Sequence, residues 1–286
     1  MFKSSQYDTV MKRALMILAA LLVVCFVLRM VACSVTKPEE DPKDSESESV
    51  SDEPTDEPTD SIQDSESDGD GESEQVPADS VILAPTEDAG QEYIDKIIFL
   101  GDSTTHTLDA FGKVPETQVW TGEAKTLALY TNIDQTKIVY PVTKELMTIG
   151  EAAAKAKPEY LVITLGLNGG VGDYFEERQF KVAYRKLINA IKENSPETRI
   201  ILNNIFPVSS LIEGYKTINN PNINTANGWI YDLAEEFGLK YLNSRECLID
   251  ENGELRLDYS QPDGIHMQPA AADALLMYIR THAYID

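Results

Sequence analysis

The sequence predicts an α/β fold in which helices cover both faces of a mostly parallel sheet. Two observations support this expectation. Short, continuous apolar runs recur from about residue 96 onward, and amphipathic helical patterns separate them. Parallel strands have continuous apolar sequences because both of their faces are buried, and helical crossovers connect them. Sheets of this kind collect ligands beyond the carboxyl ends of their strands, so functional residues are expected just after each run.

Five runs are predicted strands, and turn-forming or polar residues bound them. The first ends at Gly101, the second stops at Pro141, and the third is the longest. In chain order they cover residues 96–100, 137–140, 160–165, 199–202 and 240–242.

Four helical patterns lie between and after these runs. Residues 143–157 are rich in Ala, Glu and Lys and end before Pro158. Residues 176–194 place their apolar side chains on one face, and 224–237 stop at Gly238, a suitable C-cap. The last pattern covers residues 269–283.

An apolar segment at residues 14–35 predicts a membrane anchor. It has 22 residues, and Arg29 near one end is its single charge. About 20 apolar residues cross a bilayer as a helix, and a terminal Arg can reach the interface. Basic residues before the segment predict a cytoplasmic N-terminus and an exported C-terminal part. Two alternatives, a lipoprotein modified at Cys33 and a cleaved signal, also place the remainder outside the cytoplasm. Residues 1–35 are therefore expected to form the cytoplasmic N-terminus and a single transmembrane signal-anchor.

Acidic residues concentrate in the next segment. The chain has 24 basic and 48 acidic residues, and 18 of the acidic ones lie in residues 36–80, beside two basic ones. This Ser-, Pro- and Thr-rich composition cannot bury enough apolar surface to fold, so residues 36–90 are expected to be a disordered linker before a domain at 91–286. The acidic pattern at 64–69 is expected to be part of this tract and not a metal site. A formal net charge of −24 argues against a nucleic-acid partner.

Three motifs carry chemistry at the expected positions. Asp102-Ser103 follows the first run, Asn168 follows the third, and Asp263 precedes His266 by three residues near the C-terminus. A serine hydroxyl becomes an effective nucleophile when a histidine accepts its proton and a carboxylate orients that histidine. An asparagine amide can donate a hydrogen bond to the oxyanion that forms during acyl transfer.

In this order, the Gly-Asp-Ser, Gly-x-Asn and Asp-x-x-His motifs resemble those of the SGNH/GDSL hydrolase family over about residues 95–285. The resemblance implies a flavodoxin-like three-layer α/β/α sandwich that hydrolyses or transfers acyl esters without a cofactor or metal. It also implies a catalytic triad of Ser103, His266 and Asp263, with an oxyanion hole formed by Ser103, Gly122 and Asn168. The chain departs from the family at Gly169, where Asp is common.

Other residues are given supporting or structural roles. Asp102 is expected to brace the turn between strand and helix. His106 has no acid three residues before it and is expected to be structural or to line the pocket, while His282 is expected to be structural. Cys247 is expected to be a buried, inert thiol. The polar connection at 206–229 is a candidate wall of the site.

Together these features predict an exported, membrane-tethered serine esterase that removes short acyl groups, with acetyl the expected group, from a cell-envelope or extracellular carbohydrate. A tether and a long spacer suit an immobile glycan substrate. Two alternatives share the fold: an O-acetyltransferase acting on an envelope glycan, and a non-catalytic envelope-binding module.

Overall fold

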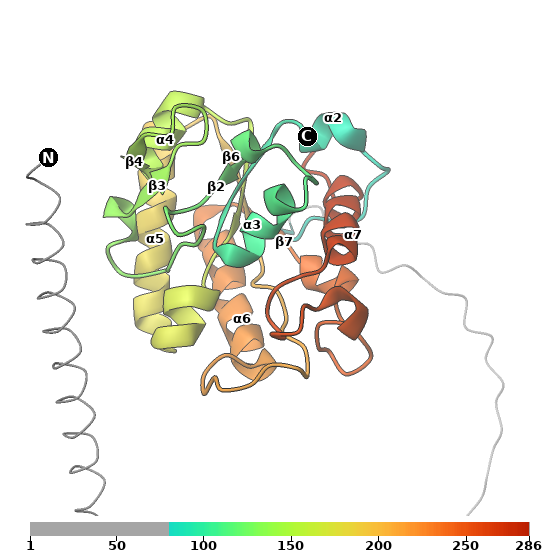
Figure 1. The fold of residues 1–286 in the computed structure, drawn as a ribbon. Coiled ribbons are helices and arrows are strands. Elements are labelled where there is room, and N and C mark those ends of the chain that lie inside the picture. Colours follow the sequence, from blue (N-terminus) through green and yellow to red (C-terminus); the bar gives the residue numbers. More distant parts are fainter. Residues whose placement is uncertain (1–79, 286) are drawn as a thin grey trace, which may run out of the picture. The chain divides into compact units, whose positions relative to one another are not determined.

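The computed structural model describes residues 80–285, which are built around a five-stranded sheet (Figure 1). All neighbouring strands of this sheet are parallel, which confirms the α/β fold with a mostly parallel sheet. Its strands are β1 (Ile97–Gly101), β2 (Val119–Trp120), β5 (Tyr160–Thr164), β6 (Arg199–Asn203) and β7 (Lys240–Leu242). A separate antiparallel ribbon pairs β3 (Lys137–Val139) with β4 (Leu146–Thr148).

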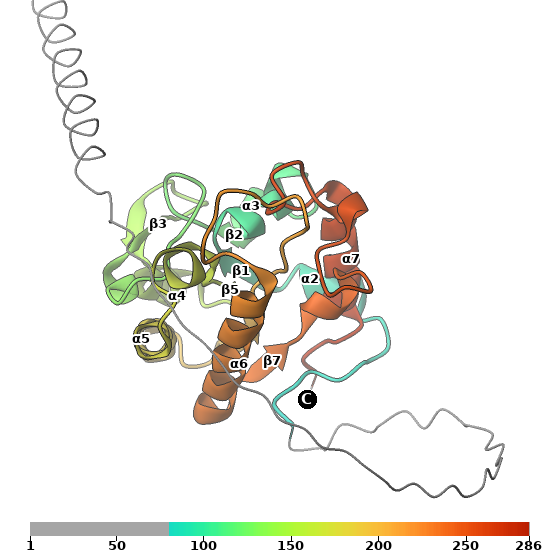
Figure 2. The same ribbon diagram turned by 90° about the horizontal axis from the view of Figure 1, so that it is seen from below.

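Alternating side chains of the central strands pack on opposite faces of the sheet. In β5, Leu161 and Ile163 belong to one apolar cluster, and Tyr160 and Val162 belong to another. Helices α4, α5 and α6 pack on the first face, and α2, α3 and α7 pack on the second (Figure 2). The helices are α2 (Gly90–Ile94), α3 (Ser103–Ala110), α4 (Ile149–Ala156), α5 (Glu177–Asn194), α6 (Asn220–Phe237) and α7 (Pro269–Arg280). The sheet is therefore the middle of three layers.

The order of the strands determines where a site can form. Across the sheet the order is β2-β1-β5-β6-β7. When the strands of this sheet are numbered by themselves, the order is 2-1-3-4-5, which is the flavodoxin-like order. Successive strands are added toward one edge and then toward the other, and this change occurs between the first and third strands. Here those strands are β1 and β5. Ligands bind at such a switch point, beyond the carboxyl ends of the strands. Ser103 lies shortly after the end of β1, and Asn168 lies shortly after the end of β5.

Two of the predicted elements differ in the structure. Residues 137–139 form a strand, but they pair with β4 outside the parallel sheet, and β2 takes the place beside β1. With only two residues, β2 is too short to produce an apolar run. The helix predicted from residue 143 begins at Ile149, because Thr148 caps it in a capping box with Glu151 and the residues before Thr148 form β4.

Residues 80–90, predicted to belong to the linker, contact the rest of the described domain. Leu83 donates its backbone N–H to Tyr241 in the edge strand β7, and Arg280 of α7 forms an ion pair with Asp88. The predicted anchor at 14–35, the acidic pattern at 64–69 and most of the linker lie outside the described residues. Within residues 80–285, no helix combines the length and apolar character needed to cross a membrane.

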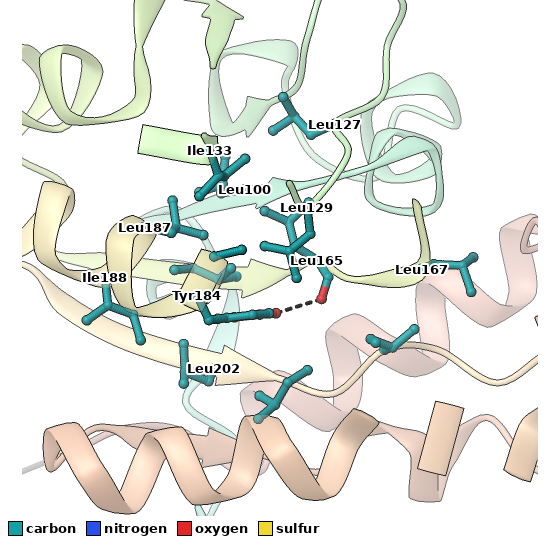
Figure 3. Packing of buried hydrophobic residues seen from close by; sticks show 14 of the residues in the cluster. Leu100, Leu127, Leu129, Ile133, Leu165, Leu167, Tyr184, Leu187, Ile188 and Leu202 are labelled. Atoms are coloured by element: carbon teal, nitrogen blue, oxygen red, sulfur yellow. Dashed lines mark hydrogen bonds between the residues drawn. The ribbon is translucent and has the colours of Figure 1, made fainter. Parts of the chain in front are cut away.

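The core also holds the end of β5 in place. Tyr184 of α5 is fully buried, and its hydroxyl donates a 2.6 Å hydrogen bond to the carbonyl oxygen of Leu165 (Figure 3). Leu165 immediately follows β5. The helix thereby satisfies a buried carbonyl at the point where the chain leaves the sheet, three residues before Asn168.

Candidate active site

The turn from β1 into α3 presents Ser103 at the start of a helix. Asp102 is the N-cap, and its carboxylate accepts hydrogen bonds from the backbone N–H and the hydroxyl of Thr104, at 3.0 and 2.6 Å. The first N–H groups of a helix have no partner within the helix. Ser103 is the first residue of α3, so its N–H has no partner within the helix.

The structure brings Ser103, His266 and Asp263 into one chain of hydrogen bonds. The Oγ atom of Ser103 lies 2.9 Å from Nε2 of His266, and Nδ1 of His266 lies 2.6 Å from Oδ2 of Asp263. Ser103 comes from the end of β1, while the other two precede α7, so the fold joins residues 163 positions apart. This is the arrangement in which a histidine can accept the proton of a serine nucleophile.

The second oxygen of Asp263 is fixed by the backbone. Its Oδ1 accepts from the N–H groups of Ile265 and His266, both at 2.9 Å. Partial burial alone would raise the pKa of Asp263, but the hydrogen bonds from His266 and the backbone outweigh it and hold the pKa below its usual value. The ionised carboxylate can only accept, so Nδ1 of His266 carries a proton and Nε2 is free to accept from Ser103.

Between these residues, Gly264 permits a tight turn. It has φ +75°, and a Cβ there would lie 2.3 Å from the backbone nitrogen of Ile212. Ser209 also donates its N–H to the carbonyl of Gly264 at 2.9 Å. The loop that carries the base is therefore packed directly against the connection between β6 and α6.

Asn168 follows β5 and is held by Thr126, a residue that belongs to none of the sequence motifs. Its Nδ2 donates a 2.8 Å hydrogen bond to Oγ1 of Thr126, which leaves its second amide hydrogen unused. The carbonyl of Thr126 in turn accepts the N–H of Gly122 at 3.1 Å. Thr126 thus contacts both remaining residues of the predicted oxyanion hole. The role of Gly122 stays a prediction, because its N–H already donates within the loop.

Asp102 also connects the turn that carries Ser103 to the loop that carries Asn168. It is only 2% exposed, and its carboxylate accepts the backbone N–H of Asn168 in addition to the two groups of Thr104. Burial raises the pKa of Asp102, and the hydrogen bonds counteract part of that shift. The expected brace is therefore present, and it joins the ends of β1 and β5 rather than the helix turn alone.

The departure at Gly169 has a steric cause. This residue has φ +78°, and a Cβ would lie 2.6 Å from the backbone nitrogen of Leu129. That same nitrogen donates to the carbonyl of Asn168 at 2.9 Å. The backbone of the loop at 126–130 therefore occupies the space that a side chain at position 169 would need.

Restoring the family's residue with Gly169→Asp is expected to destabilise the protein by about 3 kcal/mol or more, because backbone strain and overpacking each cost about 1–3 kcal/mol. Denaturant unfolding of the variant and the wild type measures this difference. Gly228→Ala is a matched control, since a Cβ at that helical position meets no atom within 4 Å. Equal stability of Gly169→Asp and wild type would contradict the steric explanation.

The connection at 207–219, within the segment 206–229 predicted to be a wall of the site, contacts the loop that carries Asp263 and His266. Near its start, Ser209 contacts Gly264, and near its end the Thr217 hydroxyl donates to the carbonyl of Gly172 at 3.0 Å. In Figure 1 this connection and the loop before α7 both lie at the lower end of the domain. Leu211 and Tyr215 on it are exposed.

The two remaining histidines differ in their partners. His282 stacks on Tyr278 near the C-terminus, with ring centroids 3.8 Å apart, as suits a structural role. His106 is paired with an acid that lies three residues after it, whereas the acid of the Asp-x-x-His motif lies three residues before its histidine. Its Nδ1 lies 2.7 Å from Oδ1 of Asp109.

Cys247 is half-buried, and its thiol donates to the carbonyl oxygen of Ser244 at 3.1 Å. Burial raises the pKa of this thiol to about 12.

The thiol of Cys247 is therefore expected to resist alkylation in the native protein, because the thiolate is the reactive form and is scarce far below the pKa. Mass spectrometry of peptides after iodoacetamide treatment at pH 8 should show Cys247 modified only when denaturant is present. Rapid modification of the native protein would contradict this expectation.

Comparisons with known proteins identify the family of this chain. No curated protein matches the chain. Three similar solved structures are a GDSL-like lipase from Bacteroides thetaiotaomicron (16% identity, TM-score 0.42), the periplasmic domain of a lipopolysaccharide acetyltransferase from Salmonella ser. Paratyphi A (18%, 0.43) and a carbohydrate esterase family 3 protein from Talaromyces cellulolyticus (14%, 0.42). Each covers 64% of this chain, and the matches cover 85%, 82% and 93% of those chains, respectively. The model of the GDSL-like lipase/acylhydrolase family matches residues 99–274. Since that match spans more than half of the sequence, the chain belongs to the GDSL-like lipase/acylhydrolase family.

Proposed function

We propose that this protein is a serine esterase, exported and tethered to the membrane, that hydrolyses short acyl esters, with acetyl as the preferred group, on a cell-envelope or extracellular carbohydrate. The observation that carries the proposal is the hydrogen-bonded chain from Ser103 through His266 to Asp263. Membership of an acylhydrolase family supports ester chemistry. The tether rests on the apolar segment at 14–35 and the acidic residues after it.

The proposed mechanism has two steps. Ser103 Oγ attacks the ester carbonyl while Nε2 of His266 accepts its proton, and His266 then protonates the leaving alcohol to give an acyl-enzyme. Water, deprotonated by His266, attacks the acyl carbon, and His266 returns the proton to Oγ of Ser103 as the bond to the acyl group breaks and the acid is released. The oxyanion in each step would accept hydrogen bonds from the N–H of Ser103 and the amide of Asn168.

Exposure of the site supports a large substrate and hydrolysis by water. The side chains of His266 and Asp263 are 32% and 47% exposed. A triad at the surface can meet an acyl group that projects from a polymer. It also leaves water free to reach the acyl-enzyme.

The proposal is tested with the full chain and 4-nitrophenyl esters of increasing acyl length, followed by acetate release from an acetylated polysaccharide. We expect turnover of the acetyl ester to exceed that of the octanoyl ester, and covalent labelling of Ser103 by a fluorophosphonate probe. An intact protein that neither turns over acetyl esters nor takes up the probe would contradict the assignment. Protease added to intact cells should digest the hydrolase domain if it is exported.

A further inference from the structure

Helix α3 carries a second histidine–carboxylate pair, one helical turn from Ser103. Ser103, His106 and Asp109 follow one another at intervals of three residues and are partly exposed, while Thr104, Thr105, Thr107 and Leu108 of the same helix are buried. Residues three apart lie on the same side of a helix. The nucleophile and the pair therefore share the solvent-facing side of α3.

The pair fixes the orientation of the His106 ring. Its Nδ1 lies 2.7 Å from Oδ1 of Asp109, and the side chain of Asp109 is only 9% exposed. An ionised carboxylate accepts hydrogen bonds and cannot donate them, so Nδ1 of His106 carries the proton in this contact. Nε2 of the neutral ring is then an acceptor.

This acceptor has no protein partner within residues 80–285. Among these residues, the ring of His106 forms one hydrogen bond, the contact of Nδ1 with Asp109. Nε2 is not a buried atom left without a partner. The ring is 25% exposed, so a ligand can reach it. Ser103 lies one helical turn away on the same face of α3.

We propose that His106, oriented by Asp109, binds a hydroxyl group in the alcohol part of the substrate. An acceptor nitrogen one helical turn from Ser103 suits a hydroxyl donor and gives no advantage to an ester that lacks one. The subsite would therefore favour acyl esters of polyhydroxylated alcohols such as sugars. This inference rests on the proposed esterase function and assigns the substrate class of the same site.

A purely structural pair would behave differently. A side-chain pair at this spacing stabilises a helix, and that effect does not depend on which ester is hydrolysed. The distinguishing measurement is a selectivity ratio: kcat/KM for a mono-O-acetylated methyl glucoside divided by kcat/KM for cyclohexyl acetate, which has no free hydroxyl. Both are acetyl esters of a secondary alcohol on a six-membered ring.

Three substitutions of His106 in the full chain separate the two ring nitrogens. His106→Ala is expected to lower the ratio about 10-fold, chiefly through KM of the glucoside ester. The asparagine amide reaches the position of Nδ1 but not that of Nε2, so His106→Asn should resemble alanine. The longer glutamine places its amide oxygen near Nε2, so His106→Gln should restore most of the ratio. His282→Gln, at the distant structural histidine, is the matched control and should leave the ratio unchanged.

A second readout needs no turnover. The Kd of the mono-acetylated glucoside, measured by calorimetry for the Ser103→Ala protein, should rise about 10-fold when His106→Ala is added. Unchanged ratios and affinities in all His106 variants would overturn the subsite, as would rescue by asparagine instead of glutamine. Absence of turnover in the wild type together with the His106-dependent change in Kd would instead overturn the esterase function and leave the hydroxyl subsite in place.

Discussion

Ser103→Ala is expected to lower kcat for 4-nitrophenyl acetate by about 10,000-fold or more, since single replacements of a triad serine have effects of this size or larger. The substitution removes the one hydroxyl that lies 2.9 Å from Nε2 of His266, and Thr104, the next hydroxyl in the chain, is buried and bonded to Asp102. Stopped-flow and steady-state assays of purified protein measure kcat. The thermal midpoint should stay close to that of the wild type, because Ser103 is half-buried and the substitution removes only a hydroxyl that contacts His266.

Replacement of the acid of the proposed triad tests the same assignment independently. Asp263→Asn keeps the size of the side chain but can donate to Nδ1, which favours the wrong tautomer of His266, so a loss of similar size is expected. The hydrogen bonds from His266 and the backbone hold the pKa of Asp263 below its usual value, so the wild-type carboxylate is ionised at neutral pH. A Ser103→Ala protein with more than one tenth of wild-type activity, after contaminating esterases are excluded, would show that another group is the nucleophile.

The parts of the fold that the sequence predicted are those in which local pattern and burial agree. Strands β1, β5, β6 and β7 are continuous apolar runs because helices cover both of their faces. Strand β2 has only Val119 and Trp120, and it is defined by its pairing with Phe99 and Leu100. Such a strand is a tertiary feature, and no periodicity within two residues can reveal it.

The site shows the same division between local and tertiary information. The motifs contain Ser103, Asn168, Asp263 and His266, and the structure joins the first to the last two through hydrogen bonds. Thr126 belongs to no motif, and its importance depends on a loop that folds back over Asn168, 42 residues away. The contact of Asp102 with the backbone of Asn168 is equally non-local. The grouping of Ser103, His266 and Asp263 was therefore predictable from residue type and order, whereas the contacts that hold Asn168 depend on tertiary structure.

Asn168→Ala is expected to lower kcat about 100- to 1,000-fold with little change in KM. An oxyanion exists only in the transition state and the tetrahedral intermediate, so its donor contributes to kcat, and losing one donor costs about 2.7–4 kcal/mol. The fold should persist, because the backbone contacts of Asn168 with Leu129 and Asp102 do not need its side chain. Steady-state kinetics with an acetyl ester measure both constants.

Variants at Thr126 test whether the amide must be held in place. Thr126→Val removes the hydroxyl that accepts the 2.8 Å hydrogen bond from Nδ2 of Asn168 while keeping the shape of the side chain. Without this anchor the amide can rotate, and we expect kcat to fall by about 10-fold, less than for loss of the amide itself. Thr126→Ser retains the hydroxyl and should retain kcat. In the double variant with Asn168→Ala, the Thr126→Val change should have no further effect, because an anchor contributes nothing once the group it holds is gone. If the two losses instead multiply, Thr126 acts independently of the oxyanion donor, and a separate role in binding would have to be assigned to it.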